Sequence, residues 1–134
     1  MNIIGNGVDI VKNERIKKSL KLKGFIKRIF TKNEIFQSKK INNKINFFAK
    51  RFAAKEAFVK AIGTGFRDDI NFIDIEIKNN NQGKPLINLS NNIKRFLRKK
   101  FKINKYKIFL SFSDEKNYSI AFVVFNKIKW LKIL

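Results

Sequence analysis

The segment from residue 45 to residue 62 constrains the fold more than any other, because it predicts one long, largely buried helix. It is rich in alanine, which has the highest helix propensity, and it also carries large apolar residues such as Phe47 and Phe58. Apolar side chains in this number favour a central position over a surface one. Gly63 and Gly65 follow directly and predict the end of the helix, since glycine readily forms C-caps and turns.

The segments around this helix predict mainly antiparallel strands. Residues 72–78 place isoleucines on one face and Asp, Glu and Lys on the other, which is the period of a half-buried strand. Pro85 suits the first position of a second strand, residues 85–89. Further strands are expected over residues 2–11, 107–113 and 118–125, and the last two form a hairpin. We therefore predict an α+β fold, with an antiparallel sheet packed on a long central helix in a single lobe.

Helix-start signals mark the other elements. Thr31 and Glu34 have the spacing of a capping box and predict a helix over residues 32–38. Ser90 predicts the N-cap of a helix that ends near Phe101. An amphipathic helix and a short apolar connector with helical spacing are expected over residues 12–22 and 25–30.

Length and composition indicate one domain and exclude several kinds of chemistry. The 134 residues are 44% hydrophobic, which is enough for one core, and we expect a domain over residues 1–126 and a basic tail over residues 127–134. The chain has no Cys and no His, which excludes disulfides, thiolate zinc sites and Ser-His-Asp catalysis. Acid–base chemistry would therefore use carboxylates, lysines or metal-bound water.

No signal peptide and no membrane-spanning run is visible in the sequence. The interpretation is a cytoplasmic protein without a membrane partner.

The formal net charge of +21 has two compatible interpretations. One is a partner rich in negative charge, such as a phosphorylated cofactor, a nucleic acid or an acidic protein. The other is an A/T-rich genome, because Lys, Asn, Ile and Phe dominate and all four can be encoded by codons built of A and T alone. The charge by itself identifies no function.

Two isolated carboxylates, Asp9 and Glu56, stand out in this basic chain. If the fold brings them together they form a site for a hard cation, and Mg²⁺ held by few protein ligands is usually completed by water and substrate phosphates. Glu56 and Lys60 are four residues apart on the predicted long helix, so an ordinary solvated ion pair is the alternative.

The joint pattern of these residues resembles the holo-acyl-carrier-protein synthases, the small class of 4′-phosphopantetheinyl transferases. Residues 5–11 read GNGVDIV, and residues 50–57 read KRFAAKEA, with Lys60 and Gly63-Thr64-Gly65 after them. The connector at residues 30–34, the Gly83-Lys84-Pro85 turn and the closing hairpin are also similar, so the resemblance covers about residues 1–126.

The resemblance implies transfer of the 4′-phosphopantetheine group from coenzyme A to a serine of apo acyl carrier protein, in support of fatty acid biosynthesis. It implies that Asp9 and Glu56 bind Mg²⁺ and that Lys60 is catalytic with them. The implied coenzyme A-binding residues are Arg51, Lys60, Gly63, Gly65, Lys84 and Pro85. The acidic carrier protein is expected on Arg15, Lys18 and Lys21, and the family implies a homotrimer with sites at subunit junctions.

One position departs from the family and one rival function is left open. Many members carry a His before the Ser or Thr of the hairpin strand, and Phe109 is assigned to that position here. The rival is a small basic nucleic-acid-binding protein, in which aromatic and Lys side chains contact bases and phosphates. No nucleic-acid partner is expected, because the basic residues are spread along the chain and no recognition motif is evident.

Overall fold

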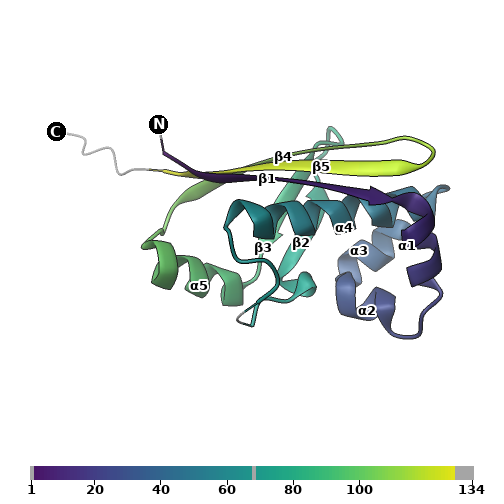
Figure 1. Ribbon diagram of the computed structural model, residues 1–134, viewed down its shortest axis with the longest axis horizontal. Helices are drawn as coiled ribbons and strands as arrows, with labels where there is room; N and C mark the ends of the chain where they lie inside the picture. The colour runs from purple at the N-terminus through teal and green to yellow at the C-terminus, as the bar shows by residue number, and fades with distance from the viewer. Residues whose placement is uncertain (1, 68, 129–134) are drawn as a thin grey trace.

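A long helix beneath a three-stranded sheet organises the structure, a computed structural model that describes residues 2–67 and 69–128 (Figure 1). Helix α4 (Lys44–Ala61) runs along one face of an antiparallel sheet with the strand order β1-β5-β4. The strands are β1 (Ile3–Lys12), β4 (Tyr106–Asp114) and β5 (Tyr118–Lys127). The predicted α+β class, the central helix and the closing hairpin are confirmed.

The remaining elements lie around α4. At one end are three short helices, α1 (Asn13–Leu20), α2 (Phe25–Ile29) and α3 (Lys32–Ser38), and at the other is α5 (Asn91–Phe101) (Figure 1). A second, two-stranded antiparallel sheet consists of β2 (Ile75–Asn79) and β3 (Pro85–Leu89). No helix among the described residues is long and apolar enough to cross a membrane.

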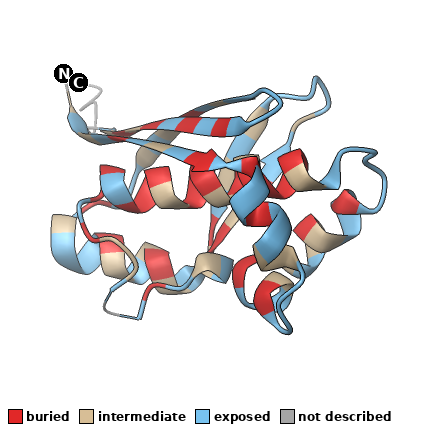
Figure 2. Ribbon diagram, turned by 45° about the vertical axis from the view of Figure 1, so that its right-hand side comes forward, coloured by how far each residue is buried: buried red, intermediate tan, exposed pale blue. Residues whose placement is uncertain are grey.

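The core lies between α4 and the inner face of the larger sheet. Figure 2 shows buried residues along α4 and alternating buried and exposed positions on the strands. Strand β1 lies directly on the helix: a Cβ on Gly7 would be 1.9 Å from the carbonyl oxygen of Ala57, and one on Gly5 would be 2.1 Å from that of Ala61. Glycine in this strand is therefore required by the close approach of two backbones.

The helix caps that the sequence predicts are formed in the structure. Thr31 Oγ1 accepts from the Glu34 amide at 3.2 Å, and the Glu34 carboxylate accepts from the Thr31 amide at 2.8 Å, which confirms the capping box. Ser90 Oγ accepts from the Ile93 amide at 3.4 Å, so Ser90 caps α5. Gly63 follows the C-cap of α4 with φ of +76°, the left-handed conformation expected there.

The predicted strand over residues 72–78 is wrong at its beginning. Phe72–Asp74 forms a 3₁₀ turn, and the strand starts only at Ile75. The reason is Asp74, whose carboxylate accepts from the Asn71 amide at 2.9 Å and from Ser90 Oγ at 2.7 Å. These bonds turn the backbone, so Ile73 is 49% exposed instead of sharing a face with Ile75.

The C-terminal boundary differs slightly from the expected one. Lys127, the first residue of the expected tail, still belongs to β5, and the Ile128 amide donates to the Lys105 carbonyl at 3.1 Å. The rest of the expected tail, residues 129–134, lies outside the described residues.

Candidate active site

Asp9 of β1 and Lys60 of α4 meet at the surface where the strand crosses the helix. Lys60 Nζ lies 3.0 Å from Asp9 Oδ1 and also donates to the Val8 carbonyl at 2.9 Å. The Asp9 side chain is 17% exposed and that of Lys60 is 51% exposed. The pair is therefore open to solvent on one side.

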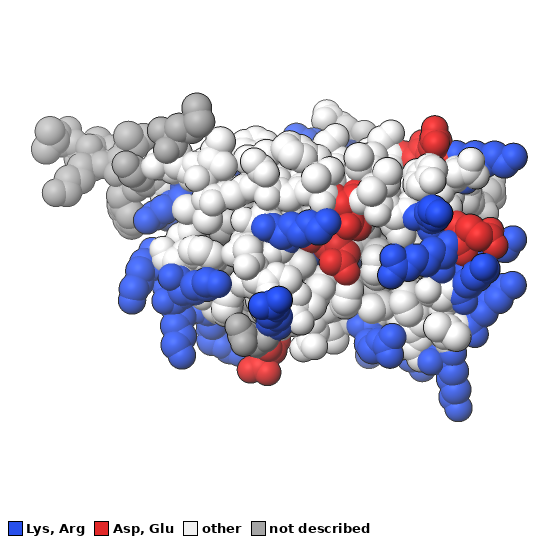
Figure 3. Space-filling view, in the orientation of Figure 1, with Lys and Arg blue, Asp and Glu red and all other residues white. Residues whose placement is uncertain are grey.

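Glu56 belongs to the same cluster. Burial raises the pKa of its carboxyl, and the negative charge of Asp9 raises it further, whereas Lys60 and Arg15 act in the opposite direction. Two carboxylates thus lie close enough to repel each other. Figure 3 shows a small group of acidic atoms between β1 and α4, with Lys and Arg side chains on both sides.

The backbone of β1 explains why these side chains converge. Side chains two residues apart in a strand point to the same face, so Asp9 points toward α4 as Gly7 does. Gly7 has no side chain and lets the strand approach the helix at Ala57. Glu56 and Lys60 are neighbours on the helix surface at i and i+4, and the close approach brings Asp9 beside them.

The donor set of this cluster fits a hard divalent cation. Carboxylate oxygens are the protein ligands that Mg²⁺ prefers, and Mg²⁺ usually keeps several positions for water and phosphate oxygens. No group of three or more Asp, Glu, His or Cys that could hold a metal is found among residues 2–67 and 69–128. The arrangement therefore suits a cation that is completed by a phosphate-bearing ligand.

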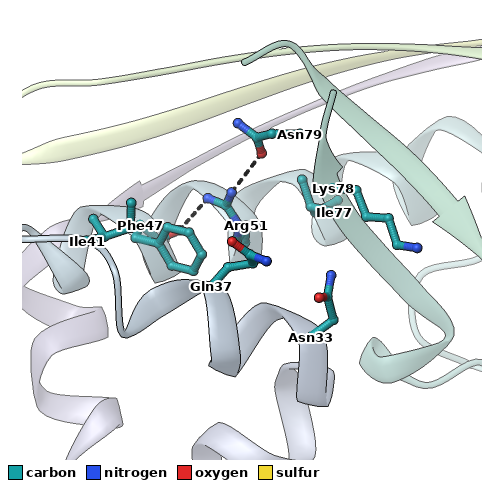
Figure 4. Close-up of a pocket in the computed structure, with 8 residues that line it drawn as sticks. All are labelled: Asn33, Gln37, Ile41, Phe47, Arg51, Ile77, Lys78 and Asn79. Atoms are coloured by element: carbon teal, nitrogen blue, oxygen red, sulfur yellow. Dashed lines mark hydrogen bonds between the residues drawn. The ribbon is translucent and has the colours of Figure 1, made fainter. Parts of the chain in front are cut away.

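Arg51 lies in a second, more enclosed site on α4. Its guanidinium donates to the Phe47 carbonyl at 3.3 Å and to Asn79 Oδ1 at 3.0 Å, and it lies over the Phe47 ring (Figure 4). Burial lowers the pKa of Arg51 to about 10, although Glu34 opposes the shift. The site is a pocket of about 450 Å³, lined by Asn33, Gln37, Ile41, Phe47, Arg51, Ile77, Lys78 and Asn79.

The turn between β2 and β3 is linked to Arg51. Asn79 Nδ2 donates to the Gly83 carbonyl at 3.0 Å while its Oδ1 accepts from Arg51. The Asn79 amide thus connects the guanidinium to the turn that carries Lys84 and Pro85. Arg51, Lys84 and Pro85 are predicted coenzyme A-binding residues, and together they form the Arg51 group.

The predicted site residues therefore fall into two groups. Arg51 and Lys60 are nine residues apart, which places them on opposite faces of a helix with 3.6 residues per turn. Asp9, Glu56 and Lys60 lie on one face, and Gly63 and Gly65 follow the helix end just beyond them. One chain by itself does not bring the Arg51 group to this cluster.

The predicted carrier-binding residues form an exposed basic surface. Arg15 and Lys18 lie on α1, and Lys21 is its C-cap; all three are exposed. Arg15 and Lys18 border a shallow hollow of about 470 Å³ that is also lined by Leu22, which is 63% exposed. The sequence prediction did not single out Leu22, although an apolar residue among the basic residues at the end of this helix is a recognisable feature.

Phe109, which was assigned to the family's His position, lies on the outer face of the larger sheet. Phe109 is 44% exposed, and its register places it on the sheet face opposite α4, with Lys107 Nζ 4.9 Å from its ring. Phe112 lies on the inner face, and its ring is 5.7 Å from the Arg51 guanidinium carbon. Within one chain, Phe112 of the hairpin thus lies beside the Arg51 guanidinium.

A buried ion pair next to the site was also overlooked. Lys55 Nζ lies 2.6 Å from Glu34 Oε1 and donates to the carbonyls of Ile29 and Phe72 at 2.7 and 3.2 Å. Burial lowers the pKa of Lys55, and the charge of Glu34 opposes this shift. Because Lys55 precedes Glu56, its three bonds fix the rotation of α4 at the acidic cluster.

The sequence of this chain matches a known family. Residues 5–123 match the 4′-phosphopantetheinyl transferase superfamily, and the chain belongs to it. It is 56% identical over 127 residues to the holo-[acyl-carrier-protein] synthase of Pelagibacter ubique, covering 95% of this chain and 99% of that protein. It is 51% identical over 128 residues to the holo-[acyl-carrier-protein] synthase of Ehrlichia chaffeensis, covering 91% and 95%.

Solved structures show the same fold. The holo-[acyl-carrier-protein] synthase of Neisseria meningitidis matches with a TM-score of 0.84 and 38% identity, over 93% of this chain and 99% of that one. The Bacillus anthracis holo-(acyl-carrier-protein) synthase in complex with CoA (3′,5′-ADP) matches with a TM-score of 0.79 and 35% identity, over 96% and 100%. The Helicobacter pylori synthase in complex with coenzyme A has a TM-score of 0.77 and 32% identity, over 90% and 99%.

Proposed function

We propose that this protein transfers the 4′-phosphopantetheine group of coenzyme A to a serine of apo acyl carrier protein and releases adenosine 3′,5′-bisphosphate. The observation that carries the proposal is the convergence of Asp9, Glu56 and Lys60 in a chain that covers nearly the full length of holo-[acyl-carrier-protein] synthases. The product would serve fatty acid biosynthesis, and the cytoplasmic location expected from the sequence stays a prediction.

The reaction forms one phosphorus–oxygen bond and breaks another. The serine oxygen attacks the pyrophosphate phosphorus attached to pantetheine, and the bridging oxygen leaves with the nucleotide. Negative charge develops on the leaving phosphate, and the exposed Lys60 ammonium would neutralise it. The chain has no His, so the serine proton would go to a carboxylate or to metal-bound water.

Mg²⁺ is the proposed metal, with Asp9 and Glu56 as its protein ligands. When bound, it supplies positive charge to pyrophosphate oxygens. The cation would offset the repulsion between the two carboxylates. Lys60 would then exchange its bond to Asp9 for one to the phosphate.

The most direct test is mass spectrometry of apo carrier protein after incubation with this protein, coenzyme A and Mg²⁺. The expected result is a mass increase equal to one phosphopantetheine, and an unmodified carrier would contradict the proposal. The nucleic-acid-binding alternative is compared by thermal melting. Coenzyme A with Mg²⁺ should raise the melting temperature more than a single-stranded oligonucleotide does.

Carrier-protein docking on the basic surface of α1 predicts a strong dependence on salt. Attraction between exposed charges is screened over roughly 8 Å at physiological ionic strength. The KM for carrier protein should therefore rise with salt, and Arg15→Glu should raise it further while the KM for coenzyme A changes little. Steady-state kinetics at several salt concentrations measure both. A KM indifferent to salt and to Arg15→Glu would assign the basic surface to genome composition.

A homotrimer with shared coenzyme A sites is the proposed assembly. Two observations support it. Arg51 and the cluster of Asp9, Glu56 and Lys60 lie on opposite faces of α4. The outer face of the larger sheet is apolar and exposed. A neighbouring subunit could complete the site and cover this face. The exposed apolar side chains on the outer face include Val8, Ile10, Phe109, Ile120 and Phe122.

The trimer is tested by light scattering. Phe122 is 46% exposed on the outer face, whereas Phe112 lies on the inner face, so Phe122 is the proposed interface residue. Phe122→Lys should dissociate the assembly and lower turnover together, whereas Lys107→Ala on the same face should preserve the assembly. A wild-type protein that is a stable, fully active monomer would refute the shared site.

A further inference from the structure

Asn13, the first residue of α1, anchors this helix to the turn between β4 and β5. The residue is 4% exposed. Its Nδ2 donates to the carbonyls of Glu115 and Lys116 at 2.8 and 3.1 Å, and its Oδ1 accepts from Ser119 Oγ at 2.7 Å. Its backbone amide donates to the Asn117 carbonyl at 2.8 Å. This residue thus makes three hydrogen bonds to the turn and one to Ser119 of β5.

The same turn is held from its other side by the start of α4. Asn46 Nδ2 donates to Asp114 Oδ2 at 2.7 Å and to the Glu115 carbonyl at 3.1 Å. Lys50 Nζ lies 3.2 Å from Asp114 Oδ1. Because the Glu115 carbonyl accepts from both Asn13 and Asn46, one polar network joins the beginnings of α1 and α4 through the turn.

Helix α1 has few other contacts that fix its orientation. It spans eight residues; Asn13 and Ile16 are buried, and Leu20 is partly buried against the core. Lys12 is at its N-cap position and provides no side-chain hydrogen bond. A helix of this length is not stable by itself, so its direction depends on its contacts with the rest of the protein. Ile16 and Leu20 supply non-directional apolar packing, whereas the Asn13 bonds have defined geometry.

We propose that Asn13 is a positioning residue for carrier-protein docking, which rests on the transferase function proposed above. By joining α1 to the turn, it holds the basic surface of Arg15 and Lys18 in one orientation relative to Asp9 and Glu56. A docking surface that is already ordered binds with a smaller entropy loss. Arg15 is two residues from Asn13 on the same helix, so the orientation that Asn13 gives α1 also determines the position of Arg15.

Steady-state kinetics of Asn13→Ala test the proposal. The KM for carrier protein should rise by about 5- to 10-fold, the effect of roughly one hydrogen bond's net contribution, with kcat and the KM for coenzyme A within about twofold of wild type. Asn13→Asp should be at least as damaging, because a carboxylate would face two carbonyl oxygens. Ser119→Ala removes a single bond and should give a smaller rise, which keeps the test open if Asn13→Ala does not fold.

Asn92→Ala is the matched control. Asn92 is on α5, and its side chain also donates two hydrogen bonds, to the Asp69 carbonyl at 2.9 Å and to Asp74 Oδ2 at 3.2 Å. Its loss should leave the KM for carrier protein unchanged. If Asn13→Ala raised the KM for carrier protein and the KM for coenzyme A equally, or raised neither, the positioning role would be overturned.

Hydrogen exchange on the free protein separates this inference from the function on which it rests. Asn13→Ala should speed exchange of the α1 amides and leave α5 unchanged, and Asn92→Ala should do the reverse. Unchanged exchange in α1 would overturn the proposed anchor even in an active enzyme. If wild-type protein modifies no carrier, the transferase proposal fails, and exchange alone still decides whether Asn13 orders α1.

Discussion

Lys55→Met is expected to lower the free energy of unfolding by about 3–5 kcal/mol, the range for removing one partner of a buried ion pair. The side chains of Lys55 and Glu34 are both 0% exposed. Methionine keeps most of the length of the side chain but removes the ammonium, so the Glu34 carboxylate would stay buried without its countercharge. The carbonyls of Ile29 and Phe72 would lose a donor as well.

Urea unfolding measures this loss, and an exposed ion pair provides the control. Lys78 Nζ lies 3.4 Å from Glu76 Oε1, and the Lys78 side chain is 50% exposed, so Lys78→Met should cost less than about 1 kcal/mol. Adding Glu34→Gln to Lys55→Met should recover part of the loss, since no charge is then buried alone. Equal losses for Lys55→Met and Lys78→Met would show that the buried pair contributes no more than a surface pair.

Elements defined by local signals could be predicted from the sequence. The capping box at Thr31 and the N-cap at Ser90 depend on residues within one turn, and both form as expected. The start of β2 was mispredicted because two bonds of Asp74 override the alternation that favoured a strand at Ile73. One is local, from the Asn71 amide, and the other comes from Ser90, sixteen positions further along the chain.

The burial of Lys55 could not be read from its neighbours in sequence. On a helix pattern it looks like any Lys beside Glu56, and Glu34 is explained by its capping box alone. The ion pair appears only when α3 and α4 pack together and bring these residues, 21 apart in the chain, to 2.6 Å. The glycines of β1 carried a clearer signal, since glycine inside a strand commonly marks a close backbone approach.

The candidate site was predictable to a different extent in its two halves. The motif pattern predicted the cluster of Asp9, Glu56 and Lys60, and the fold brings these residues together. Their roles, and those of the Arg51 group, stay predictions. The link from Arg51 to the turn at Gly83 was not predictable, because it passes through Asn79, a residue that no motif singles out.

Glu56→Gln and Asp9→Asn are expected to lower turnover by about a hundred- to a thousandfold while the fold stays intact, the size of losing a main electrostatic stabiliser. Both changes keep the size of the side chain and remove one negative charge. Glu115→Gln removes one charge from an exposed position away from the cluster and should leave turnover unchanged. The measurements are carrier modification by mass spectrometry and circular dichroism of each variant.

Cation binding by these two residues can be measured without turnover. Mg²⁺ should raise the melting temperature of wild type and of Glu115→Gln, and should have no effect on Glu56→Gln or Asp9→Asn.

In metal-free buffer Glu56→Gln should be at least as stable as wild type. The folded-state pKa of Glu56 is raised above its ordinary value of 4.5, so ionisation of Glu56 lowers stability as pH rises above that value. The advantage of Glu56→Gln should therefore disappear below about pH 4.5. Normal turnover, or an undiminished response to Mg²⁺, in either carboxylate variant would remove Asp9 and Glu56 as the metal ligands.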